Sequence, residues 1–398
     1  MTTKHELLIP AGSYEKAIYA IKYGADAIYI GPKAYSLRAR SSNFNIKEIK
    51  MVVDFAHKFN KKVYVALNII CHNSDLKGFE NYFKKIDECN IDGVIVADPF
   101  IVESINRLNP NLEIHISTQQ SVTNSKAALF WKRNHAKRIV LGREVSGKEL
   151  KLILDSLNQE IEIEYFIHGA VCISYSGRCM MSNNFSLRDA NVGGCAQSCR
   201  WKYKVMNVNS CSKSFTMSAK DMSLLNDMQE LLKLDIASFK VEGRMKSIHY
   251  VTTVTNCYRK VIDNFYNNNL NNDKTSIFQE LKKAENRLSG NAWYDGNPNI
   301  TKMLYVDNEE SINQIFAFNF EKSITPNVFE ITSRNNFDKN SNFEIVKPGL
   351  KNEQFKILKI LDENNLEIDN VKTPMKKYKI FTDKKISFEP YTIARVIY

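Results

Sequence analysis

The first two thirds of the chain alternate short apolar runs with stretches of helical period. Apolar residues recur three and four positions apart over Tyr14–Tyr23, Ile46–Phe59 and Ser146–Leu157, which predicts amphipathic helices. Between such stretches lie eight short runs rich in β-branched and aromatic residues, typical of buried strands. These runs are Glu6–Ile9, Ala27–Ile30, Lys62–Leu67, Gly93–Val96, Glu113–Ile116, Arg138–Leu141, Glu162–Phe166 and Ala237–Val241.

Eight strand–helix units within residues 1–290 fit a (β/α)8 TIM-barrel-like domain, whose usual size is about 250 residues. A doubly wound open sheet is the main competitor, because the number of strands does not establish closure. The first strand is followed by Pro10-Ala11-Gly12-Ser13 and not by G-x-G-x-x-G, which argues against dinucleotide binding. Ser13 and Ser146 stand at N-cap positions and Gly24 at a helix C-terminus.

Polar or glycine residues follow all eight predicted strands. In a barrel these strand ends meet on one face, so we expect one shared polar pocket there. The connection after the seventh strand is unusually long: it covers residues 168–221, before a helix expected near Met222. Because structureless insertions of that length are usually functional, and this one holds five of the eight cysteines, we expect it to carry function.

The last part of the chain, residues 300–398, changes character. Alternating runs such as Phe343–Val346 and Lys379–Thr382 are separated by turn signals such as Lys347-Pro348-Gly349. This pattern predicts a small all-β domain, a barrel or a sandwich. It contains no Cys or His, so a binding or packing module is a better interpretation than a catalytic one.

The formal net charge of +11 suits an anionic partner such as nucleic acid, although abundant lysine also simply favours solubility. No apolar run is long enough to span a membrane, and the N-terminal residues do not resemble a signal peptide. We therefore expect a cytoplasmic protein, in which disulfides are rare and cysteines serve metal binding, catalysis or ordinary burial.

Four cysteines of the long connection follow the pattern Cys172-x6-Cys179-x15-Cys195-x3-Cys199. Four thiolates can bind zinc or an iron–sulfur cluster, and the x6 spacing is wider than a usual zinc knuckle, which favours iron–sulfur. The competing interpretation is four small buried residues, but the polar neighbours make a plain core segment a poor fit. The other cysteines, Cys71, Cys89, Cys211 and Cys257, stand alone, and burial is the better interpretation for them.

The run EYFIHGAVCISYSGRCMMS at residues 164–182 resembles the signature of the collagenase-like peptidase family, peptidase family U32. The resemblance extends over nearly the whole chain, through LLIPAG, GADAIYIG, STQ and KVEGR to a tail, Phe343–Ile380, similar to the family's C-terminal β-domain. GCAQSCRW at residues 194–201 and SAKDM at 218–222 look closest to the family's tRNA-hydroxylating branch.

This resemblance implies a 4Fe–4S cluster on Cys172, Cys179, Cys195 and Cys199. It also implies prephenate-dependent conversion of the wobble uridine in the tRNA anticodon to 5-hydroxyuridine. Some relatives need a partner protein, and one branch acts on ribosomal RNA.

Residues that would contact substrate carry planar cations, amides or aromatic rings near the strand ends. The candidates for RNA or carboxylate binding are Arg38, Arg40, Gln119, Arg143, Tyr175, Arg178, Arg200 and Trp201. The candidate catalytic residues are His168, Glu242 and Arg244. Any one arginine could equally form a surface ion pair, and Trp201 could pack against the cysteine segment.

Two other functions remain open at this point. A peptidase would need recognisable machinery, and neither H-E-x-x-H nor G-x-S-x-G occurs, although a cysteine nucleophile with His168 survives as a weak alternative. A pure RNA-binding module would leave the four clustered cysteines without a role.

Overall fold

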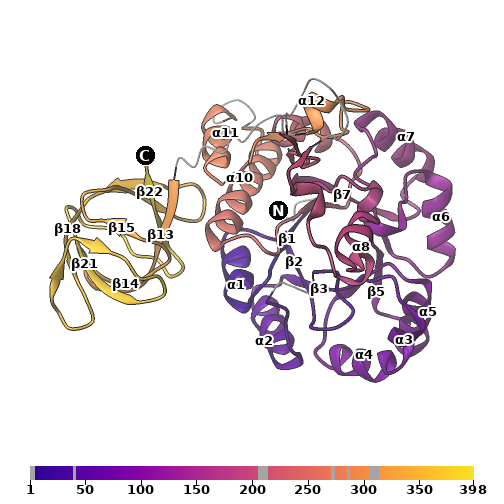
Figure 1. Cartoon of the computed structure of the whole chain (residues 1–398), viewed down its shortest axis with the longest axis horizontal. Helices are drawn as coiled ribbons and strands as arrows, with labels where there is room; N and C mark the ends of the chain where they lie inside the picture. The colour runs from indigo at the N-terminus through magenta and orange to yellow at the C-terminus, as the bar shows by residue number, and fades with distance from the viewer. Residues whose placement is uncertain (1–4, 39–41, 205–213, 270–273, 285–286, 305–313) are drawn as a thin grey trace.

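The computed structural model describes residues 5–38, 42–204, 214–269, 274–284, 287–304 and 314–398. Within these residues the chain forms a barrel of parallel strands encircled by helices, and a separate antiparallel β-domain lies beside it (Figure 1). None of the described helices is long and apolar enough to cross a membrane.

Eight parallel strands close the barrel, because β11 pairs with both β1 and β7. This closure confirms the predicted (β/α)8 architecture and excludes the open doubly wound sheet. Each strand lies within about three residues of its predicted position. The strands are β1 (Glu6–Pro10), β2 (Ala27–Ile30), β3 (Lys62–Leu67), β4 (Gly93–Val96), β5 (Glu113–Ile116), β6 (Arg138–Val140), β7 (Glu162–Gly169) and β11 (Ser238–Val241).

Most of the helices around the barrel bury an apolar face, and the two helices that follow Ser13 and Ser146 begin at the N-caps that the sequence predicts. Ser13 accepts a hydrogen bond from the Lys16 N–H, and Ser146 accepts one from the Glu149 N–H. Gly24 has φ +109°, a left-handed conformation that favours glycine after a helix. The helices are α1 (Tyr14–Lys22), α2 (Ile46–His57), α3 (Asn73–Leu76), α4 (Phe79–Asp87), α5 (Pro99–Leu108), α6 (Ser125–Arg133), α7 (Gly147–Leu157), α9 (Met228–Leu231), α10 (Ile248–Tyr266), α11 (Lys274–Lys282) and α12 (Ile300–Met303).

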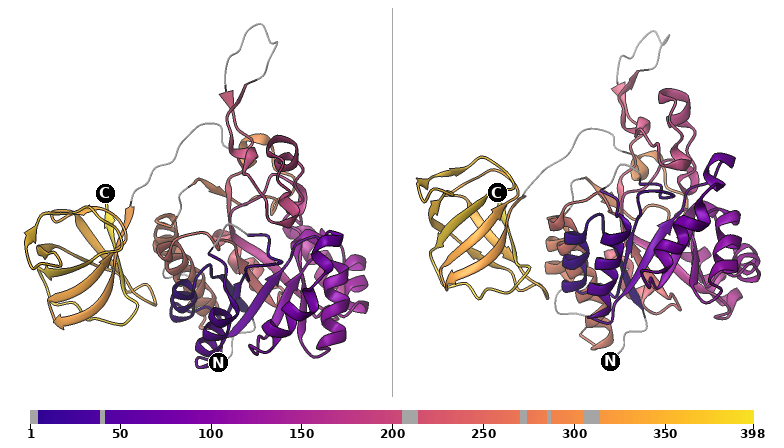
Figure 2. Two further views of the ribbon diagram at one scale, coloured as in Figure 1. Left: turned by 60° about the horizontal axis from the view of Figure 1, so that its bottom comes forward. Right: turned by 90° about the horizontal axis from the view of Figure 1, so that it is seen from below.

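The long connection after β7 holds α8 (Met181–Ser186), three short 3-10 turns and the strand pair β8 (Tyr203–Lys204) and β9 (Ser214–Phe215). Coloured magenta, it projects from the barrel end opposite the N-terminal residues (Figure 2). The prediction of a helix near Met222 is wrong. Residues Asp221–Ser223 form β10, which pairs antiparallel with the end of β7 and in parallel with β12 (Ser289–Gly290), so pairing across the sheet overrides local helical preference.

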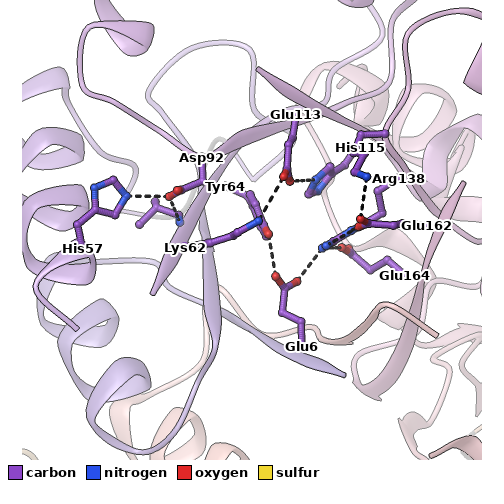
Figure 3. Close-up of polar contacts among 12 residues, drawn as sticks. Glu6, His57, Lys62, Tyr64, Asp92, Glu113, His115, Arg138, Glu162 and Glu164 are labelled. Atoms are coloured by element: carbon purple, nitrogen blue, oxygen red, sulfur yellow. Dashed lines mark hydrogen bonds and ion pairs between the residues drawn. The ribbon is translucent and has the colours of Figure 1, made fainter. Parts of the chain in front are cut away.

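Inside the barrel, charged side chains from several strands form a network of ion pairs (Figure 3). Arg138, with a side chain 5% exposed, forms ion pairs with Glu6 at 2.7 Å, Glu162 at 2.8 Å and Glu164 at 3.3 Å. Glu164 is fully buried and also pairs with Lys240 at 2.5 Å. Each charged group of this network has an opposite partner, which reduces the free-energy penalty of burying it.

The C-terminal domain is an eight-stranded antiparallel sheet around its own aromatic and aliphatic core. It packs against α1, α10 and α11: Arg395, fully buried, pairs with Glu280 of α11 at 2.6 Å, the Tyr23 hydroxyl lies 2.8 Å from the Val346 carbonyl oxygen, and Ile248 of α10 joins the apolar contact. Its strands are β13 (Gln314–Thr325), β14 (Val328–Ser333), β16 (Asn342–Val346), β17 (Glu353–Phe355), β18 (Ile357–Leu361), β19 (Glu367–Ile368), β21 (Lys377–Thr382) and β22 (Ile393–Ile397), with the separate pair β15 (Phe337–Asp338) and β20 (Asn370–Val371).

Candidate functional site

A pocket of about 180 Å3 opens at the C-terminal ends of the barrel strands. Its wall is built by strand ends on one side and by the cysteine-containing segment after β7 on the other. The polar residues that line it are Tyr29, Arg38, Asn68, Ser117, Thr118, Gln119, Arg143, Glu144, Ser174, Ser176, Ser182, Gln197, Ser198, Lys240, Glu242 and Arg244, together with Cys172, Cys179, Cys195 and Cys199. The shared polar pocket expected from the strand ends is therefore present.

Glu242 lies at the centre of the cationic side of the pocket. Its carboxylate accepts a hydrogen bond from Arg38 Nη2 at 2.6 Å and one from the Tyr29 hydroxyl at 3.1 Å. Burial would raise the pKa of Glu242, but the positive charges of Arg38, Arg143 and Arg244 outweigh it and lower the pKa to about 2. Glu242 is therefore an anion held among cations at neutral pH.

Arg244 is buried beside Glu242 and anchored by side chains of the segment that follows β2. Its guanidinium donates to Ser36 Oγ at 2.9 Å and to Asn43 Oδ1 at 2.6 Å. Burial lowers its pKa to about 10, which leaves it charged at neutral pH. A Cβ on Gly31 would lie 2.1 Å from Arg244 Nη2, so only glycine at the end of β2 leaves room for this guanidinium.

Arg143 and Glu144, directly after β6, connect the strands to the cysteine-containing segment. The Arg143 guanidinium lies 4.1 Å from the centre of the Phe166 ring and donates to the Ala170 carbonyl oxygen. Glu144 accepts hydrogen bonds from the Ser176 N–H and from the Ser176 hydroxyl, the latter at 3.1 Å. These contacts hold the start of the cysteine-containing segment against the barrel mouth.

The four cysteines of the predicted cluster site all line this pocket. Cys179 is 8% exposed and the other three are partly buried. Burial raises the pKa of the Cys199 thiol, and the other three cysteines raise it further, which places them close to it. For Cys179, burial acts in the same direction, but hydrogen bonds from Ser174 and Ser182 lower its pKa overall.

Arginines stand close to three of the four thiols. Burial raises the pKa of Cys172 and of Cys199 overall, and Arg143 and Arg200 respectively offset part of that rise. The pKa of Arg38 is raised mainly by Glu242, with a smaller contribution from Cys195. Thiolates are soft ligands that suit iron–sulfur clusters and zinc, and neighbouring cations stabilise the thiolate form. The donor set and its charges fit such a group chemically.

Among the described residues, no group of three or more His, Cys, Asp or Glu side chains is already arranged to hold a metal ion. The structure thus gathers four thiols on one pocket wall without placing them in a ligand geometry. Two glycines of this segment adopt left-handed backbone conformations, Gly177 with φ +76° and Gly193 with φ +100°. The iron–sulfur ligand set remains a prediction that rests on the shared pocket and the donor chemistry.

The remaining predicted site residues fall into three groups. Gln119 lines the pocket beside Arg38, Arg143, Glu242 and Arg244. Tyr175, Arg178, Arg200 and Trp201 lie in the cysteine-containing segment and outside the pocket lining, and Tyr175 is 57% and Trp201 44% exposed. Arg40 and the lone Cys211 lie outside the described residues.

His168 also lies outside the lining of the pocket. It is 2% exposed and packs between the rings of Tyr250 and Tyr258, with its Nδ1 3.3 Å from the Tyr258 hydroxyl. Burial, aided by the charge of Lys246, lowers its pKa to about 3 and keeps the imidazole neutral. This position suits a structural role better than proton transfer to a substrate in the pocket.

Sequence reasoning missed two pocket residues, Lys240 and Tyr29. The Lys240 ammonium lies 4.6 Å from the centre of the Tyr29 ring and pairs with Glu164 below the pocket. A signal for Lys240 exists in the sequence. Side chains two residues apart on a strand share a face, so Lys240 points to the same interior as Glu242.

A closed (β/α)8 barrel with a polar, thiol-lined pocket at the C-terminal strand ends has the architecture of a TIM-barrel enzyme. The model of Peptidase family U32 matches residues 12–304, and that of the Peptidase family U32 C-terminal domain matches residues 314–395. The chain belongs to peptidase family U32, as its sequence motifs indicate.

Three curated relatives show how varied this family is. The tRNA hydroxylation protein P1 of Bacillus subtilis is 40% identical, over 97% of this chain and 94% of its own length. The 23S rRNA 5-hydroxycytidine C2501 synthase of Escherichia coli is 35% identical over 65% of this chain, but only 39% of its own length. A collagenase of Porphyromonas gingivalis is 29% identical over 73% of each chain.

Proposed function

We propose that this protein hydroxylates tRNA, converting the wobble uridine of the anticodon to 5-hydroxyuridine. The observation that carries the proposal is the convergence of four thiols and a group of arginines on one pocket at the barrel mouth. A relative named for tRNA hydroxylation, similar over 97% of this chain, supports RNA hydroxylation as the reaction class. The basic charge of +11 is suited to a polyanionic substrate.

In this proposal Cys172, Cys179, Cys195 and Cys199 hold a 4Fe–4S cluster. A bound cluster supplies electron transfer beside the substrate. Arg38, Arg143 and Arg200 each lie close to one of the cysteines and would balance the negative charge of the thiolates. Gly193 and Gly194 precede Cys195, and a Cβ on Gly194 would lie 2.6 Å from the Asp189 carbonyl oxygen, so the backbone can turn tightly here.

The cationic side of the pocket suits a carboxylate co-substrate, for which we propose prephenate. Guanidinium groups bind carboxylates by two parallel hydrogen bonds, and Arg38, Arg143 and Arg244 surround this side. Glu242 and Tyr29 hold Arg38 in place through their shared hydrogen bonds. Hydroxylation replaces the C5–H bond of uridine by C5–OH and therefore requires an oxidant as well as a bound RNA.

A peptidase is the second candidate, because one relative is named a collagenase. A cysteine or serine nucleophile would need a base in reach, and none of the described residues that line the pocket is a histidine. His168 is buried away from the lining, which weakens the cysteine–histidine alternative. Hydroxylation of ribosomal RNA is the third candidate. It would use the same thiols and arginines of the pocket as hydroxylation of tRNA.

Nucleoside analysis of total tRNA and ribosomal RNA from a deletion strain separates these functions. We expect 5-hydroxyuridine derivatives to disappear from tRNA and to return with the wild-type gene, while ribosomal RNA is unchanged. Unchanged tRNA nucleosides together with lost gelatin cleavage would instead establish the peptidase.

Iron and acid-labile sulfide in anaerobically purified protein test the cluster. We expect Cys195→Ala to lose most of the bound iron and the tRNA modification. Cys89→Ala is the matched control, because this buried thiol lies outside the pocket and donates only to backbone carbonyls. A wild-type protein that carries stoichiometric zinc, or no metal, would contradict the cluster.

A further inference from the structure

Four aromatic side chains form an exposed patch on the cysteine-containing segment. We call this patch the aromatic cluster. It consists of Phe185 on α8, Trp201 two residues after Cys199, Tyr203 on β8 and Phe215 on β9. Ring centroids are 6.4 Å apart for Phe185 and Trp201, 6.0 Å for Phe185 and Tyr203, and 5.9 Å for Tyr203 and Phe215. Phe185, Trp201 and Phe215 are nevertheless 55%, 44% and 45% exposed. Contiguous exposed apolar surface of this kind marks a binding site.

The aromatic cluster is tied directly to the wall of the pocket. The Tyr203 hydroxyl donates to the Ser198 carbonyl oxygen at 2.6 Å, and Thr216 Oγ1 donates to the Cys199 carbonyl oxygen at 3.2 Å. Ser198 and Cys199 both line the pocket. A molecule that lies on the rings therefore lies beside residues of the pocket wall.

The charges around the aromatic cluster favour a polyanion. Residues 172–204 and 214–221 contain six arginines and lysines but only two acidic residues, Asp189 and Asp221. Both carboxylates are already engaged, Asp189 with His72 at 3.0 Å and Asp221 with Lys246 at 3.4 Å. Lys202 and Lys204, which alternate with the rings in the sequence, are exposed.

Aromatic rings that alternate with cations are the composition of sites for single-stranded nucleic acid, where bases stack on rings and phosphates meet cations. A duplex keeps its bases stacked on one another and cannot offer their faces to a protein ring. An apolar protein partner would need the rings but would derive nothing from the surrounding lysines. The combination therefore points to an RNA loop.

We propose that the aromatic cluster is a stacking platform for unpaired bases of the RNA loop that carries the target nucleotide. This inference rests on the proposed function, because it takes RNA as the substrate. A target base must leave its stack to enter a pocket, which costs free energy. Neighbouring bases that stack on Trp201 and Phe185 offset that cost and hold the loop open above the pocket.

Binding of a synthetic anticodon stem–loop with a wobble uridine tests the platform, measured by fluorescence anisotropy on the anaerobically purified protein. We expect Trp201→Leu and Phe185→Leu to bind the loop about 5- to 150-fold more weakly, the range for losing one base–aromatic stack. Trp201→Phe keeps a ring and should bind nearly as well as wild type. A blunt-ended RNA duplex of two separate strands, which offers no unpaired loop, should bind all variants equally.

Phe130→Leu is the matched control, because Phe130 on α6 is also 51% exposed but lies on the side of the barrel. Salt titration gives a second readout: Lys202→Gln should reduce the dependence of affinity on salt, whereas Trp201→Leu should leave it unchanged. Iron content equal to wild type shows that the variants remain assembled.

Variants Trp201→Leu and Phe185→Leu that bind the loop as tightly as wild type would overturn the platform, even if tRNA is still hydroxylated. The same holds if they keep RNA affinity but lose a co-purifying protein, which would make the patch a protein interface. Ring-dependent binding of the loop without any hydroxylation would leave the platform standing and would refute the proposed function alone.

Discussion

The Glu242 carboxylate accepts a hydrogen bond from Arg38 Nη2 at 2.6 Å, across 204 positions of sequence. This pair joins the end of the last barrel strand to the segment that follows the second. It also places one buried anion against the arginines of the pocket, where the Glu242 pKa is lowered to about 2. The pair therefore sets the position of a guanidinium that lines the pocket.

Glu242→Gln should lower kcat/KM for tRNA modification by about 10- to 100-fold, because a charge-assisted hydrogen bond contributes roughly 1.5–3 kcal/mol. Without the carboxylate, Arg38 is no longer held and the arginines of the pocket repel one another. Steady-state modification of an anticodon stem–loop measures the effect. Glu230→Gln is the control, since its side chain is 70% exposed and pairs with Lys233 on the surface. An unchanged kcat/KM in Glu242→Gln would show that the Glu242 carboxylate is not needed to position Arg38.

Gly31→Ala should reduce activity without changing any polar group. The new Cβ would lie 2.1 Å from Arg244 Nη2 and would push the guanidinium away from Ser36 and Asn43. Overpacking of this kind lowers the free energy of unfolding by about 1–3 kcal/mol, which a lower midpoint of denaturant unfolding would show. Gly290→Ala is the comparison, because its Cβ would have its nearest neighbour at 3.7 Å. Equal activity and stability of both variants would contradict the steric argument.

His168 should make stability fall with acid well above the range of the carboxylates. Its pKa is lowered to about 3 by burial, so the folded state keeps it neutral, whereas the unfolded chain protonates it near its usual pKa of about 6.5. The unfolded state binds the extra proton, and the unfolding free energy should drop by up to about 1.4 kcal/mol per pH unit below pH about 6.5, levelling near pH 3.

Urea unfolding of wild type and His168→Gln in the same buffers measures how the unfolding free energy falls with acid. The range from pH 7.5 to 5 covers roughly the titration of an ordinary histidine. The unfolding free energy of the variant should depend less steeply on pH, because about one proton fewer is taken up on unfolding. This difference in slope holds even if the variant is less stable at neutral pH. Parallel curves for the two proteins would mean that His168 does not titrate as its burial implies.

Arg138→Met should destabilise the barrel by about 3–5 kcal/mol, because it leaves the buried Glu164 and its neighbours Glu6 and Glu162 without their shared cation (Figure 3). Denaturant unfolding gives the value. Lys137→Met is the matched control: its side chain is 54% exposed, and its pair with Glu162 should contribute less than about 1 kcal/mol. Similar losses of unfolding free energy in both variants would show that Arg138 does not stabilise the buried ion-pair network.

Most of the barrel could be predicted from the sequence, since a buried strand and an amphipathic helix each leave a local pattern. All eight strands and the caps at Ser13 and Ser146 follow from such patterns. The region near Met222 could not be predicted, because its backbone hydrogen bonds to the end of β7 arise only once the barrel has formed.

The candidate site, too, could be predicted from the sequence only in part. Its four cysteines lie within one stretch of chain, so sequence alone marked them as a group with a shared role. Their gathering on one wall, and the meeting of Arg38, Arg143, Lys240 and Glu242 opposite them, depended on tertiary structure. The physical reason is barrel closure: parallel strands end on one face, so residues that are far apart in sequence meet there, while His168, next to the cysteines in sequence, turns into the core.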